Sequence, residues 1–288
     1  MVIAVDRWVS QGGRMVSCRV QDHRKLDNAQ PRILVVLPSY NAQQWIRPCL
    51  AALAANTEPH DILLIEDGGM PLDALPPADN LIHCRMARNI GLIGVLNFAA
   101  SLALEEGYEF YARQDADDFS FPDRLALQRE RADATGADLT VSGVEVIDSE
   151  GRPLWKTSGD LSPDLVGALS VRNIFVHSTW FLRTSVFDRI GCYDDRYVGA
   201  EDYEFVQRIV RGGVIDSVAR PLVQYRVHGG SVLASSNRPA RTTARIVWRY
   251  FSWRRPASYK GLGRSLAAAC LPRGLKAAAR KRLTRTPS

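Results

Sequence analysis

Three acidic residues stand close together where a predicted strand ends. The run Phe110–Phe119 opens with strand-forming residues and then carries Asp115, Asp117 and Asp118. Carboxylates this close repel one another, so water, backbone donors or a cation must neutralise them, and Mg²⁺ and Mn²⁺ prefer hard oxygen ligands. The cluster therefore predicts a divalent metal site. The alternative is a solvated acidic loop in which Asp118 caps the helix that Pro122 starts.

Two further acidic pairs stand where α/β proteins use carboxylates. The apolar run 62–65 leads directly into Glu66 and Asp67, and two glycines follow. Open α/β sheets bind ligands at the carboxyl ends of their strands, so this pair is a candidate for ligand binding. Glu201 and Asp202 begin a predicted helix. A carboxylate there either removes a proton from an incoming hydroxyl or merely complements the helix dipole.

Apolar runs and helical periodicity alternate along the chain from Arg32 onward. This alternation is typical of an α/β fold with a mostly parallel sheet and helices on both faces. After residue 151 the pattern loosens. The patterns predict strands over residues 33–37, 62–65, 81–84, 110–114, 139–147, 176–182 and 222–227, and helices over residues 42–55, 94–105, 122–135, 185–190 and 201–211.

Length and composition indicate a globular protein. The chain has 288 residues, of which 46% are hydrophobic, enough for one large domain with an appendage. Residues 1–31 show no sustained period and are expected to form a poorly ordered extension. The five cysteines lie far apart without a CxxC pair, which favours a reducing cytoplasm. No apolar run reaches the roughly 18 residues of a membrane-spanning helix, and no signal peptide is expected.

Charge is distributed unevenly along the chain. Residues 238–288 contain 14 of the 37 Lys and Arg residues and none of the 31 acids, which leaves a formal charge of −8 on residues 1–237. A basic segment of this kind usually meets a polyanion, either an anionic membrane surface or a nucleic acid. No nucleic-acid recognition module is evident, so nucleic acid is not an expected partner.

The basic segment also has the pattern of amphipathic helices. Three arginines recur every four residues from Arg241, while Ile246, Tyr250 and Trp253 fall on another stripe. After residues 261–263 a second apolar and basic segment follows. This composition is typical of an interfacial membrane anchor. The alternative is that the aromatic stripe packs on the acidic body.

Five motifs in order carry a resemblance to a known family. They are Pro38-Ser39-Tyr40-Asn41, Glu66-Asp67-Gly68, Asp115-Ala116-Asp117-Asp118, Glu201-Asp202 and Tyr225-Arg226-Val227-His228. With them the chain resembles glycosyltransferase family 2 from about Arg32 to Val232. The resemblance implies a GT-A fold, a nucleotide-sugar donor, a divalent cation (Mn²⁺ or Mg²⁺) and inversion at the anomeric centre. Residues 32–150 would then form the nucleotide-sugar half and residues 151–237 the acceptor half.

The resemblance also assigns roles on the donor side. Asp117 is the expected metal ligand, and His228 is expected to complete the metal shell or touch the diphosphate. Asp115 is expected to contact the nucleotide and Asp67 to accept a hydrogen bond from its base. Glu66 departs from the aspartate that is commoner in the family, which puts the local loop shape in question. The other expected donor contacts are Pro38, Tyr40 and Asn89.

On the acceptor side Asp202 is the expected general base, with Glu201 and His177 near the acceptor or behind the direct contacts. The Gln-x-x-Arg-Trp motif of processive family members does not occur, which favours transfer of one sugar, most simply from a UDP-sugar. A saccharide or lipid-linked acceptor in surface polysaccharide synthesis is expected, with the enzyme held peripherally at the inner face of the plasma membrane.

The alternatives are a catalytically idle nucleotide-sugar-binding or scaffold protein and a nucleotidyltransferase. The latter would open with a glycine-rich phosphate loop where this chain has PSYNAQQW.

Overall fold

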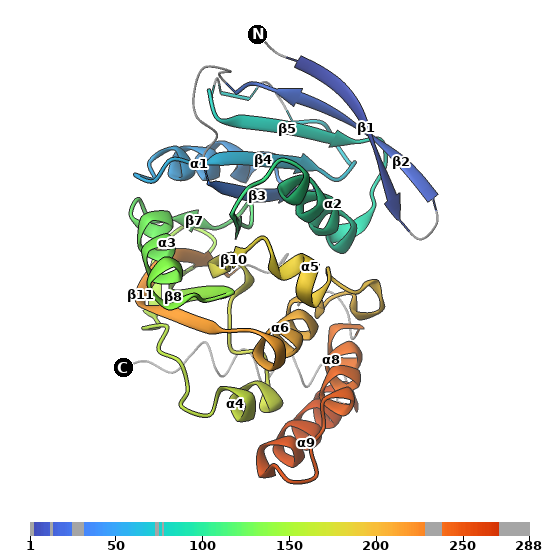
Figure 1. Ribbon diagram of the computed structural model, residues 1–288, viewed down its shortest axis with the longest axis vertical. Helices are drawn as coiled ribbons and strands as arrows, with labels where there is room; N and C mark the ends of the chain where they lie inside the picture. Colours follow the sequence, from blue (N-terminus) through green and yellow to red (C-terminus); the bar gives the residue numbers. More distant parts are fainter. Residues whose placement is uncertain are drawn as a thin grey trace.

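One large sheet runs through the molecule, with its strands in the order β1-β2-β5-β4-β3-β6-β10-β8-β11-β7 and with β9 beside β8 (Figure 1). The computed structural model describes residues 3–11, 14–24, 32–72, 75–76, 78–227 and 238–270. The strands are β1 (Ile3–Gln11), β2 (Arg14–Asp22), β3 (Ile33–Ser39), β4 (Asp61–Glu66), β5 (Leu81–Met86), β6 (Phe110–Arg113), β7 (Phe119–Ser120), β8 (Leu139–Ile147), β9 (Pro153–Lys156), β10 (Phe181–Arg183) and β11 (Ile215–Arg226).

Parallel strands form the centre of this sheet. β3 pairs in parallel with β4 and β6, and β4 pairs in parallel with β5. The short β10 runs antiparallel between β6 and β8, so β6 and β8 point the same way. The carboxyl ends of β3, β4, β6, β8 and β11 therefore meet along one edge, which is where ligands bind in open α/β sheets.

Helices cover both faces, as predicted for an α/β fold. They are α1 (Gln43–Ala54), α2 (Gly91–Glu105), α3 (Arg124–Thr135), α4 (Leu165–Val171), α5 (Val186–Ile190), α6 (Glu201–Gly212), α8 (Arg238–Arg249) and α9 (Pro256–Cys270), with 3-10 turns η1 (His177–Thr179) and η2 (Asp195–Tyr197). Alternate residues of β3 show why: Ile33 and Val35 pack with α1 and α3, whereas Leu34 and Val36 pack with α2, α5 and α6. A continuous apolar strand is thus buried on both sides.

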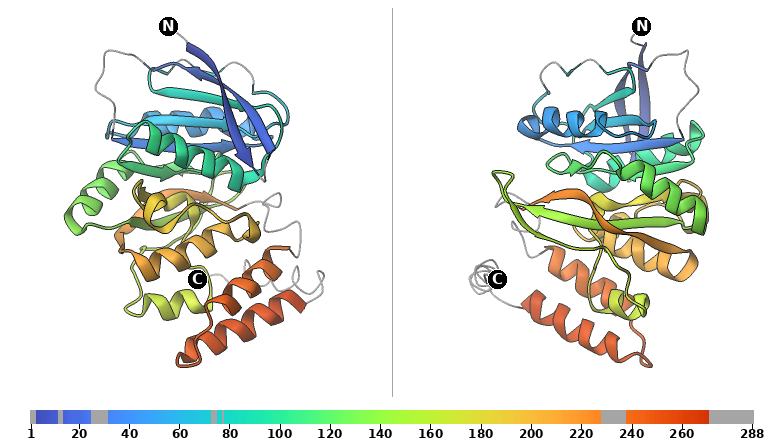
Figure 2. Two further views of the ribbon diagram at one scale, coloured as in Figure 1. Left: turned by 45° about the vertical axis from the view of Figure 1, so that its right-hand side comes forward. Right: turned by 90° about the vertical axis from the view of Figure 1, so that its left-hand side faces the viewer.

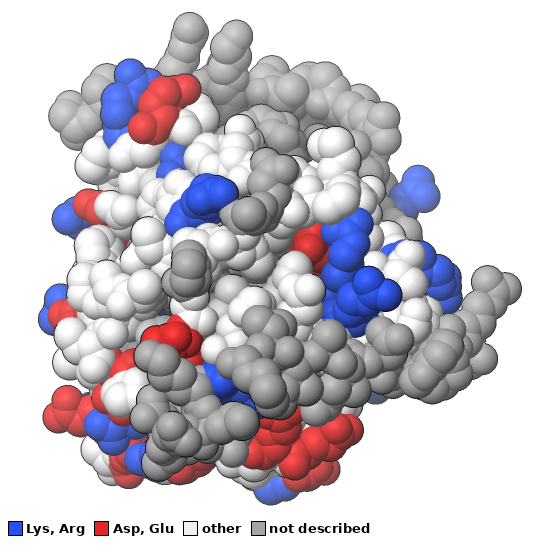
Figure 3. All heavy atoms as spheres, turned by 90° about the horizontal axis from the view of Figure 1, so that it is seen from above, with Lys and Arg blue, Asp and Glu red and all other residues white. Residues whose placement is uncertain are grey.

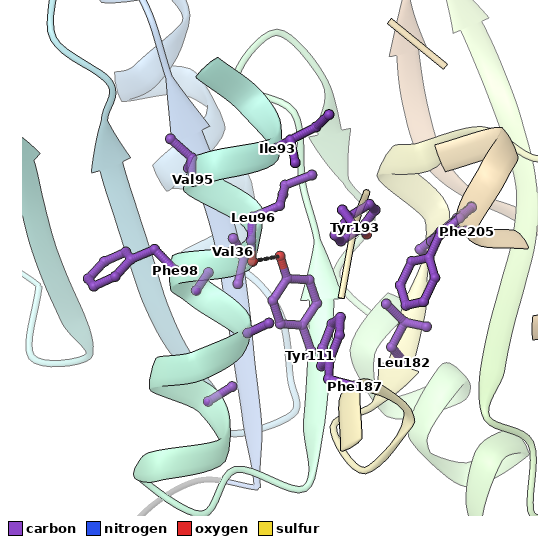
Figure 4. Close-up of a cluster of buried hydrophobic side chains, with 14 of the residues drawn as sticks. Val36, Ile93, Val95, Leu96, Phe98, Tyr111, Leu182, Phe187, Tyr193 and Phe205 are labelled. Carbon is purple, nitrogen blue, oxygen red and sulfur yellow. Dashed lines mark hydrogen bonds between the residues drawn. The ribbon is translucent and has the colours of Figure 1, made fainter. Parts of the chain in front are cut away.

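The core on the α2 face joins the two halves of the chain. Tyr111 of β6 lies between α2 and the aromatic residues of the second half, and its hydroxyl donates to the Leu96 carbonyl at 3.4 Å (Figure 4). Phe187 contacts the Tyr111 ring edge-on with ring centroids 5.1 Å apart. The edge that carries the acidic loop is therefore fixed to both halves.

Residues 1–31 differ from the sequence prediction, because β1 and β2 form an antiparallel hairpin whose second strand pairs with β5. Val16, Cys18 and Val20 alternate with polar residues and are buried against the core. Cys18 also forms a disulfide with Cys84 of β5, with Cα atoms 6.2 Å apart, a pairing that the cysteine spacing did not indicate. Regular strands therefore occupy residues 3–11 and 14–22 of the stretch in which a poorly ordered extension was expected, and their pairing with β5 cannot be seen in the local sequence.

The second half differs in detail from its predicted elements. The strand predicted over residues 176–182 is a 3-10 turn, η1, followed by the shorter β10. The last strand begins seven residues earlier than predicted, at Ile215, because its first part is only half-buried and lacks an apolar run. Two elements, β9 and α4, occupy the stretch that was expected to be loop.

Residues 238–270 of the basic segment form a helical hairpin that docks on the body (Figure 2). Ile246 and Val247 of α8 are buried in the core, and the Tyr250 hydroxyl donates to Glu204 of α6 at 2.8 Å. The small residues Ser258 and Gly261 of α9 are buried where this helix meets α4. The second segment was expected to follow residues 261–263, but α9 begins before them at Pro256 and runs through Gly261 and Gly263 to Cys270.

None of the helices in the described ranges is long and apolar enough to cross a membrane. On the face of the molecule seen from above, basic and acidic side chains lie next to one another in several places (Figure 3).

Candidate active site

A buried polar network shapes the acidic loop after β6. Gln114 donates from Nε2 to the carbonyls of Asp115 at 3.1 Å and Asp118 at 2.8 Å. Gln114 accepts in turn from Arg124 Nη1 at 2.7 Å, and Arg124 Nε donates to Gln128 at 3.0 Å. Gln114, Arg124 and Gln128 are fully buried. Because buried polar groups are costly to leave unpaired, this network holds the loop in one conformation.

Asp118 is the most deeply buried of the three loop carboxylates. It accepts hydrogen bonds from the Arg226 amide at 2.8 Å and from Ser178 Oγ at 2.5 Å. Burial, together with the charges of Asp115 and Asp117, raises its pKa well above the usual range. Asp118 therefore joins the acidic loop to β11 and η1. It has a structural role but does not cap α3, whose N-cap residue is Asp123.

Asp115 is bound by a buried arginine. Its Oδ1 pairs with Arg113 Nη2 at 2.5 Å and its Oδ2 accepts from Ser178 Oγ at 2.8 Å. Burial alone would raise the pKa of Asp115, but the charge of Arg113 and the hydrogen bonds from Ser178 and Arg113 outweigh it and lower the pKa. Asp115 is thus held ionised. Its side chain is partly exposed, so one side of the carboxylate is open to solvent.

Asp117 lies partly exposed in the turn between β6 and β7. Its carbonyl accepts from Arg226 Nε at 3.1 Å, which fixes the backbone beneath its side chain. The predicted second ligand, His228, lies outside the described residues. Within the described ranges, no three His, Cys, Asp or Glu side chains converge as a ready metal cage. Mg²⁺ typically binds one or two protein carboxylates and takes its other ligands from substrate phosphates and water, so an exposed Asp117 in a negative loop fits such a cation.

The Asp67 carboxylate binds the start of α2. Its two oxygens accept from the amides of Ile90 at 2.6 Å and Gly91 at 2.9 Å. Asn89 Nδ2 donates to the Asp67 carbonyl at 3.0 Å. A Cβ on Gly68, which has φ +70°, would lie 2.7 Å from the Asn89 amide, so only glycine allows this approach. This anchoring role was not predicted, and each carboxylate oxygen keeps acceptor capacity for a further donor.

Tyr40 and Pro38 belong to the loop and strand end beside Asp67. The Tyr40 ring is exposed and lies against Gly69, while Asn41 accepts from the Met70 amide at 3.2 Å. Pro38 pairs with Ile65 at the end of the parallel β3–β4 ladder. The predicted nucleobase contacts are therefore neighbours at the carboxyl ends of β3 and β4.

Glu66, the departure from the family pattern, is a buried anchor. It accepts from His83 Nε2 and Arg85 Nη1, each at 2.7 Å, and from the Leu72 amide at 2.8 Å. The longer side chain thus ties β4 to β5 and to the following loop. It leaves Asp67 in place.

Asp202 stands in the first turn of α6 and is oriented by two donors. Asn173 Nδ2 donates to Oδ2 at 2.8 Å, and the Tyr203 amide donates to Oδ1 at 2.7 Å. Burial first and the charge of Glu201 second raise the pKa of Asp202 to about 7. A carboxylate with this pKa can accept a proton near neutral pH, which suits a general base.

Glu201 is buried and His177 is half-buried, and each is held by a neighbouring group. Glu201 accepts from the Gly199 amide at 2.6 Å, and burial raises its pKa. His177 Nε2 lies 3.0 Å from the Tyr193 hydroxyl, and its ring packs edge-on against Trp180. Burial and then the charge of Arg113 lower the pKa of His177 to about 3, so the imidazole is neutral.

The acidic loop and Asp202 act on one another electrostatically. The charge of Asp115 contributes to the raised pKa of Asp202. Burial, followed by the charges of all three loop carboxylates and of Asp202, raises the pKa of Tyr225 to about 12. Ser178 of η1 and the Arg226 amide of β11 both bond to Asp118, so residues from both halves of the chain meet at the acidic loop.

Several residues of this site escaped sequence reasoning. Arg113 gave a weak signal, since a charged residue inside an apolar strand next to an acid needs a buried partner. Asn173 and Ser178 gave no local signal, because their contacts come from loops and helices distant in the sequence. Tyr225 belongs to one of the five motifs, but the sequence assigned it no role of its own.

Comparison with known proteins supplies the family. Residues 34–191 match the sequence profile of glycosyl transferase family 2. The chain belongs to glycosyltransferase family 2. It is 27% identical over 238 residues to an uncharacterised glycosyltransferase of Haemophilus influenzae, covering 76% of this chain and 72% of that protein. It is 31% identical over 131 residues to the succinoglycan biosynthesis protein ExoO of Rhizobium meliloti, covering 43% of this chain and 36% of that protein.

Solved structures agree with the fold. TarS of S. aureus in complex with UDP-GlcNAc superposes with a TM-score of 0.59 at 17% identity, covering 82% of this chain and 72% of that one. The mannosyltransferase PcManGT of Pyrobaculum calidifontis, in complex with GDP-Man and Mn²⁺, gives a TM-score of 0.58 at 18% identity over 91% of this chain and 77% of that one. The family 2 chain therefore has the GT-A type of α/β architecture, and it is an enzyme of the glycosyltransferase class.

Proposed function

We propose that this enzyme is an inverting, non-processive glycosyltransferase that moves one sugar from a UDP-sugar to a saccharide or lipid-linked acceptor during surface polysaccharide synthesis. The observation that carries the proposal is Asp202, a carboxylate with a pKa of about 7 that lies within electrostatic reach of the acidic loop. An inverting transfer needs such a base on the acceptor side and a negative loop that handles the diphosphate on the donor side.

The reaction follows from these positions. Asp202 accepts the proton of an acceptor hydroxyl while that oxygen forms a bond to the anomeric carbon of the donor sugar. The bond between that carbon and the diphosphate oxygen breaks in the same displacement, and the electron pair leaves with the nucleoside diphosphate. A divalent cation at Asp117 would neutralise the charge on this leaving group. Asp115 would face the nucleotide, held ionised by Arg113 and Ser178.

The nucleotide is proposed to lie along the carboxyl ends of β3 and β4. Tyr40 offers an exposed ring for packing against a base, beside Pro38. Asp67 retains acceptor capacity for an N–H of the base, and Asn89 lies next to it at the start of α2. A UDP-sugar is consistent with the UDP-GlcNAc of the TarS complex, and the relative named for succinoglycan biosynthesis supports a polysaccharide product.

We further propose that residues 238–288 hold the enzyme peripherally at the inner face of the plasma membrane. Their 14 basic residues and complete lack of acids favour an anionic surface, with roughly 1 kcal/mol for each Lys or Arg near it. A lipid-linked acceptor would be found at that surface.

One assay tests the transferase proposal. The protein is incubated with Mn²⁺ or Mg²⁺ and each common UDP- or GDP-sugar, and release of the nucleoside diphosphate is measured. Metal-dependent release from one donor supports the proposal. A protein that binds a donor without releasing the nucleotide with any acceptor tried would be an idle binding protein, and release of pyrophosphate from a nucleoside triphosphate and a sugar phosphate would indicate a nucleotidyltransferase.

A further inference from the structure

Four aromatic side chains gather where α8 turns into α9. Phe251 is at the centre, with ring centroids 6.1 Å from Trp248, 5.0 Å from Trp253 and 5.0 Å from Tyr259. The Tyr259 hydroxyl donates to the Trp253 carbonyl at 3.1 Å, which fixes the turn. Trp248, Trp253 and Tyr259 are nevertheless 62%, 74% and 51% exposed. These four residues are called the aromatic patch below.

Packing of the helical hairpin on the body does not use this patch. α8 turns Ile246 and Val247 toward the core, and Tyr250 bonds to Glu204. α9 meets α4 through its small residues, including Ser258 and Gly261. Within the described residues the hairpin docks on the body through these other side chains, while Trp248 and Trp253 contact Phe251 of the hairpin itself and keep most of their surface exposed. Contiguous exposed apolar groups of this kind mark interaction surfaces.

The surroundings of the patch are basic. Residues 238–270 contain eight Arg and Lys residues and no acid. Arg249, Arg254 and Lys260 are exposed near the patch in the sequence, and Arg255 pairs with the exposed Asp164 at 3.3 Å. An open cavity of about 640 Å³ lies at the same turn, lined by Asp164, Ser252, Arg254, Arg255, Pro256 and Ala257.

We propose that the aromatic patch is the surface that docks on an anionic phospholipid bilayer. Tryptophan and tyrosine favour the headgroup level of a membrane because their rings are apolar at one end and polar at the other. Trp248, Trp253 and Tyr259 enter that level, while Arg254, which is exposed beside Trp253, reaches headgroup phosphates. Membrane attachment therefore combines insertion of rings with charge. This inference rests on the membrane part of the proposed function.

The apolar surface continues along α9. Leu266 is 49% exposed and stands seven residues after Tyr259, which places both on the same face of the helix. The hairpin thus presents an exposed apolar stripe beside basic side chains, which is the composition of an interfacial helix. It differs from the stripe that the sequence predicted, because Ile246 and Tyr250 face the body and Trp253 alone remains exposed.

A second copy of the chain is a poorer occupant. Self-association through this surface would bring two clusters of like charge together, which costs affinity. A bilayer rich in anionic lipid removes that cost and accepts the rings without requiring a complementary pocket.

The docking surface is connected to the candidate base. Tyr250 stands between Trp248 and Phe251 of the patch and bonds to Glu204, which lies two residues after Asp202 in α6. The hairpin that would carry the bilayer is therefore packed directly on the element that carries Asp202. This arrangement suits an acceptor that is itself tethered to a membrane.

The test uses the full chain and vesicles of phosphatidylcholine alone or with about one third phosphatidylglycerol. The double variant Trp248→Ala/Trp253→Ala is expected to co-sediment with anionic vesicles on the order of tenfold more weakly than the parent. The matched control is Trp155→Ala, which removes a tryptophan of β9 that is 51% exposed and lies away from the hairpin, and it should bind like the parent. In the parent, brominated lipid should quench tryptophan fluorescence, and the double variant should lose most of that quenching.

Several outcomes would overturn the inference. If the double variant binds anionic vesicles as well as the parent does, attachment depends on charge and not on the aromatic patch. If the parent binds neutral and anionic vesicles equally well, the basic residues do not contribute to attachment. A dimer that only the parent forms would make a second copy the occupant.

Nucleotide release with a water-soluble acceptor is measured on the same proteins. If vesicle binding follows the patch while no variant or parent transfers sugar, the transferase proposal fails and the docking surface stands. If transfer proceeds while the parent does not bind anionic vesicles, the docking surface fails alone.

Discussion

Asn173 and Asp202 come from separate elements of the second half of the chain and meet at 2.8 Å, with the Asn173 amide donating to the Asp202 carboxylate. Asn173 follows α4, and Asp202 stands in the first turn of α6. The orientation of the proposed base is therefore set by a side chain that performs no chemistry. A hydrogen bond donated to a carboxylate favours its ionised form.

Replacing Asn173 should change the pH dependence of the reaction. The proposed base works when Asp202 is ionised, so kcat/KM should fall below a midpoint near 7 in the parent. Asn173→Ala removes a donor to the ionised form, which raises the pKa and moves this midpoint to higher pH, while activity at high pH is largely kept. A uniform loss at every pH would instead indicate that Asn173 only supports the fold.

Glu201 should shift the same midpoint in the opposite direction. Its negative charge contributes to the raised pKa of Asp202, after burial. Glu201→Gln removes that charge, so the midpoint of kcat/KM should move to lower pH. A midpoint that stays in place would show that burial alone sets the pKa of Asp202.

Asp202→Asn should remove the base without removing the donor site. We expect nucleotide-sugar binding close to the parent and a rate loss of about 10²–10⁴-fold, the usual contribution of acid–base catalysis. Loss of donor binding with an unchanged rate would place Asp202 on the donor side.

The same substitution should stabilise the fold at alkaline pH. The pKa of Asp202 is higher in the folded state than in the unfolded state, so ionisation costs stability as pH rises, and the full cost is present above about 7. Asparagine carries no such cost. The gain in Tm of Asp202→Asn over the parent should therefore be larger at pH 8 than at pH 5. An equal gain at both values would contradict the raised pKa.

Asp117→Asn should nearly abolish turnover and weaken the dependence of donor binding on Mn²⁺. The reason is that Asp117 is partly exposed, whereas Asp115 is paired with Arg113 and Asp118 is buried against Arg226 and Ser178. Nucleotide release measured over a Mn²⁺ titration checks this expectation, with Asp160→Asn as a control at an exposed acid outside the site. Turnover that persists in EDTA would remove the metal from the mechanism.

Features encoded locally were predictable from the sequence. A continuous apolar run predicts β3, because this strand is buried on both faces. Apolar residues at helical spacing predict α1, because this helix is buried on one face. The acidic residues at strand ends followed from the same elements. The roles of Asp115 and Asp118 did not, because Arg113, Ser178 and the Arg226 amide decide which carboxylate is paired and which is buried.

Features that need long-range pairing were missed. The hairpin of β1 and β2 gains its burial from β5, more than sixty residues away, so its short alternation looked insignificant on its own. The basic helices were expected to present Ile246 and Tyr250 to a membrane, but the body supplies Glu204 as a partner for Tyr250. A stripe on a helix shows that one face is apolar, and only the fold shows what covers it.

Gly261 and Gly263 form a matched pair for testing how α9 is held. A Cβ on Gly261 would lie 1.9 Å from the Ser170 carbonyl of α4, whereas a Cβ on Gly263 would meet nothing within 4 Å. The backbone of α4 cannot move aside without a cost in free energy. Gly261→Ala should therefore destabilise the protein by about 1–3 kcal/mol through overpacking. Gly263→Ala should stabilise it by up to about 1 kcal/mol, because alanine favours an exposed helical position.

Thermal unfolding of the two variants therefore separates contact from helix propensity, with Tm falling for Gly261→Ala and holding or rising for Gly263→Ala. Because α9 carries Tyr259 to the Phe251 ring, loosening α9 from α4 should also weaken binding to anionic vesicles. Equal Tm values for Gly261→Ala and Gly263→Ala would mean that α9 does not rest on α4 in solution. In that case α4 would not hold the aromatic patch in a fixed position on the protein.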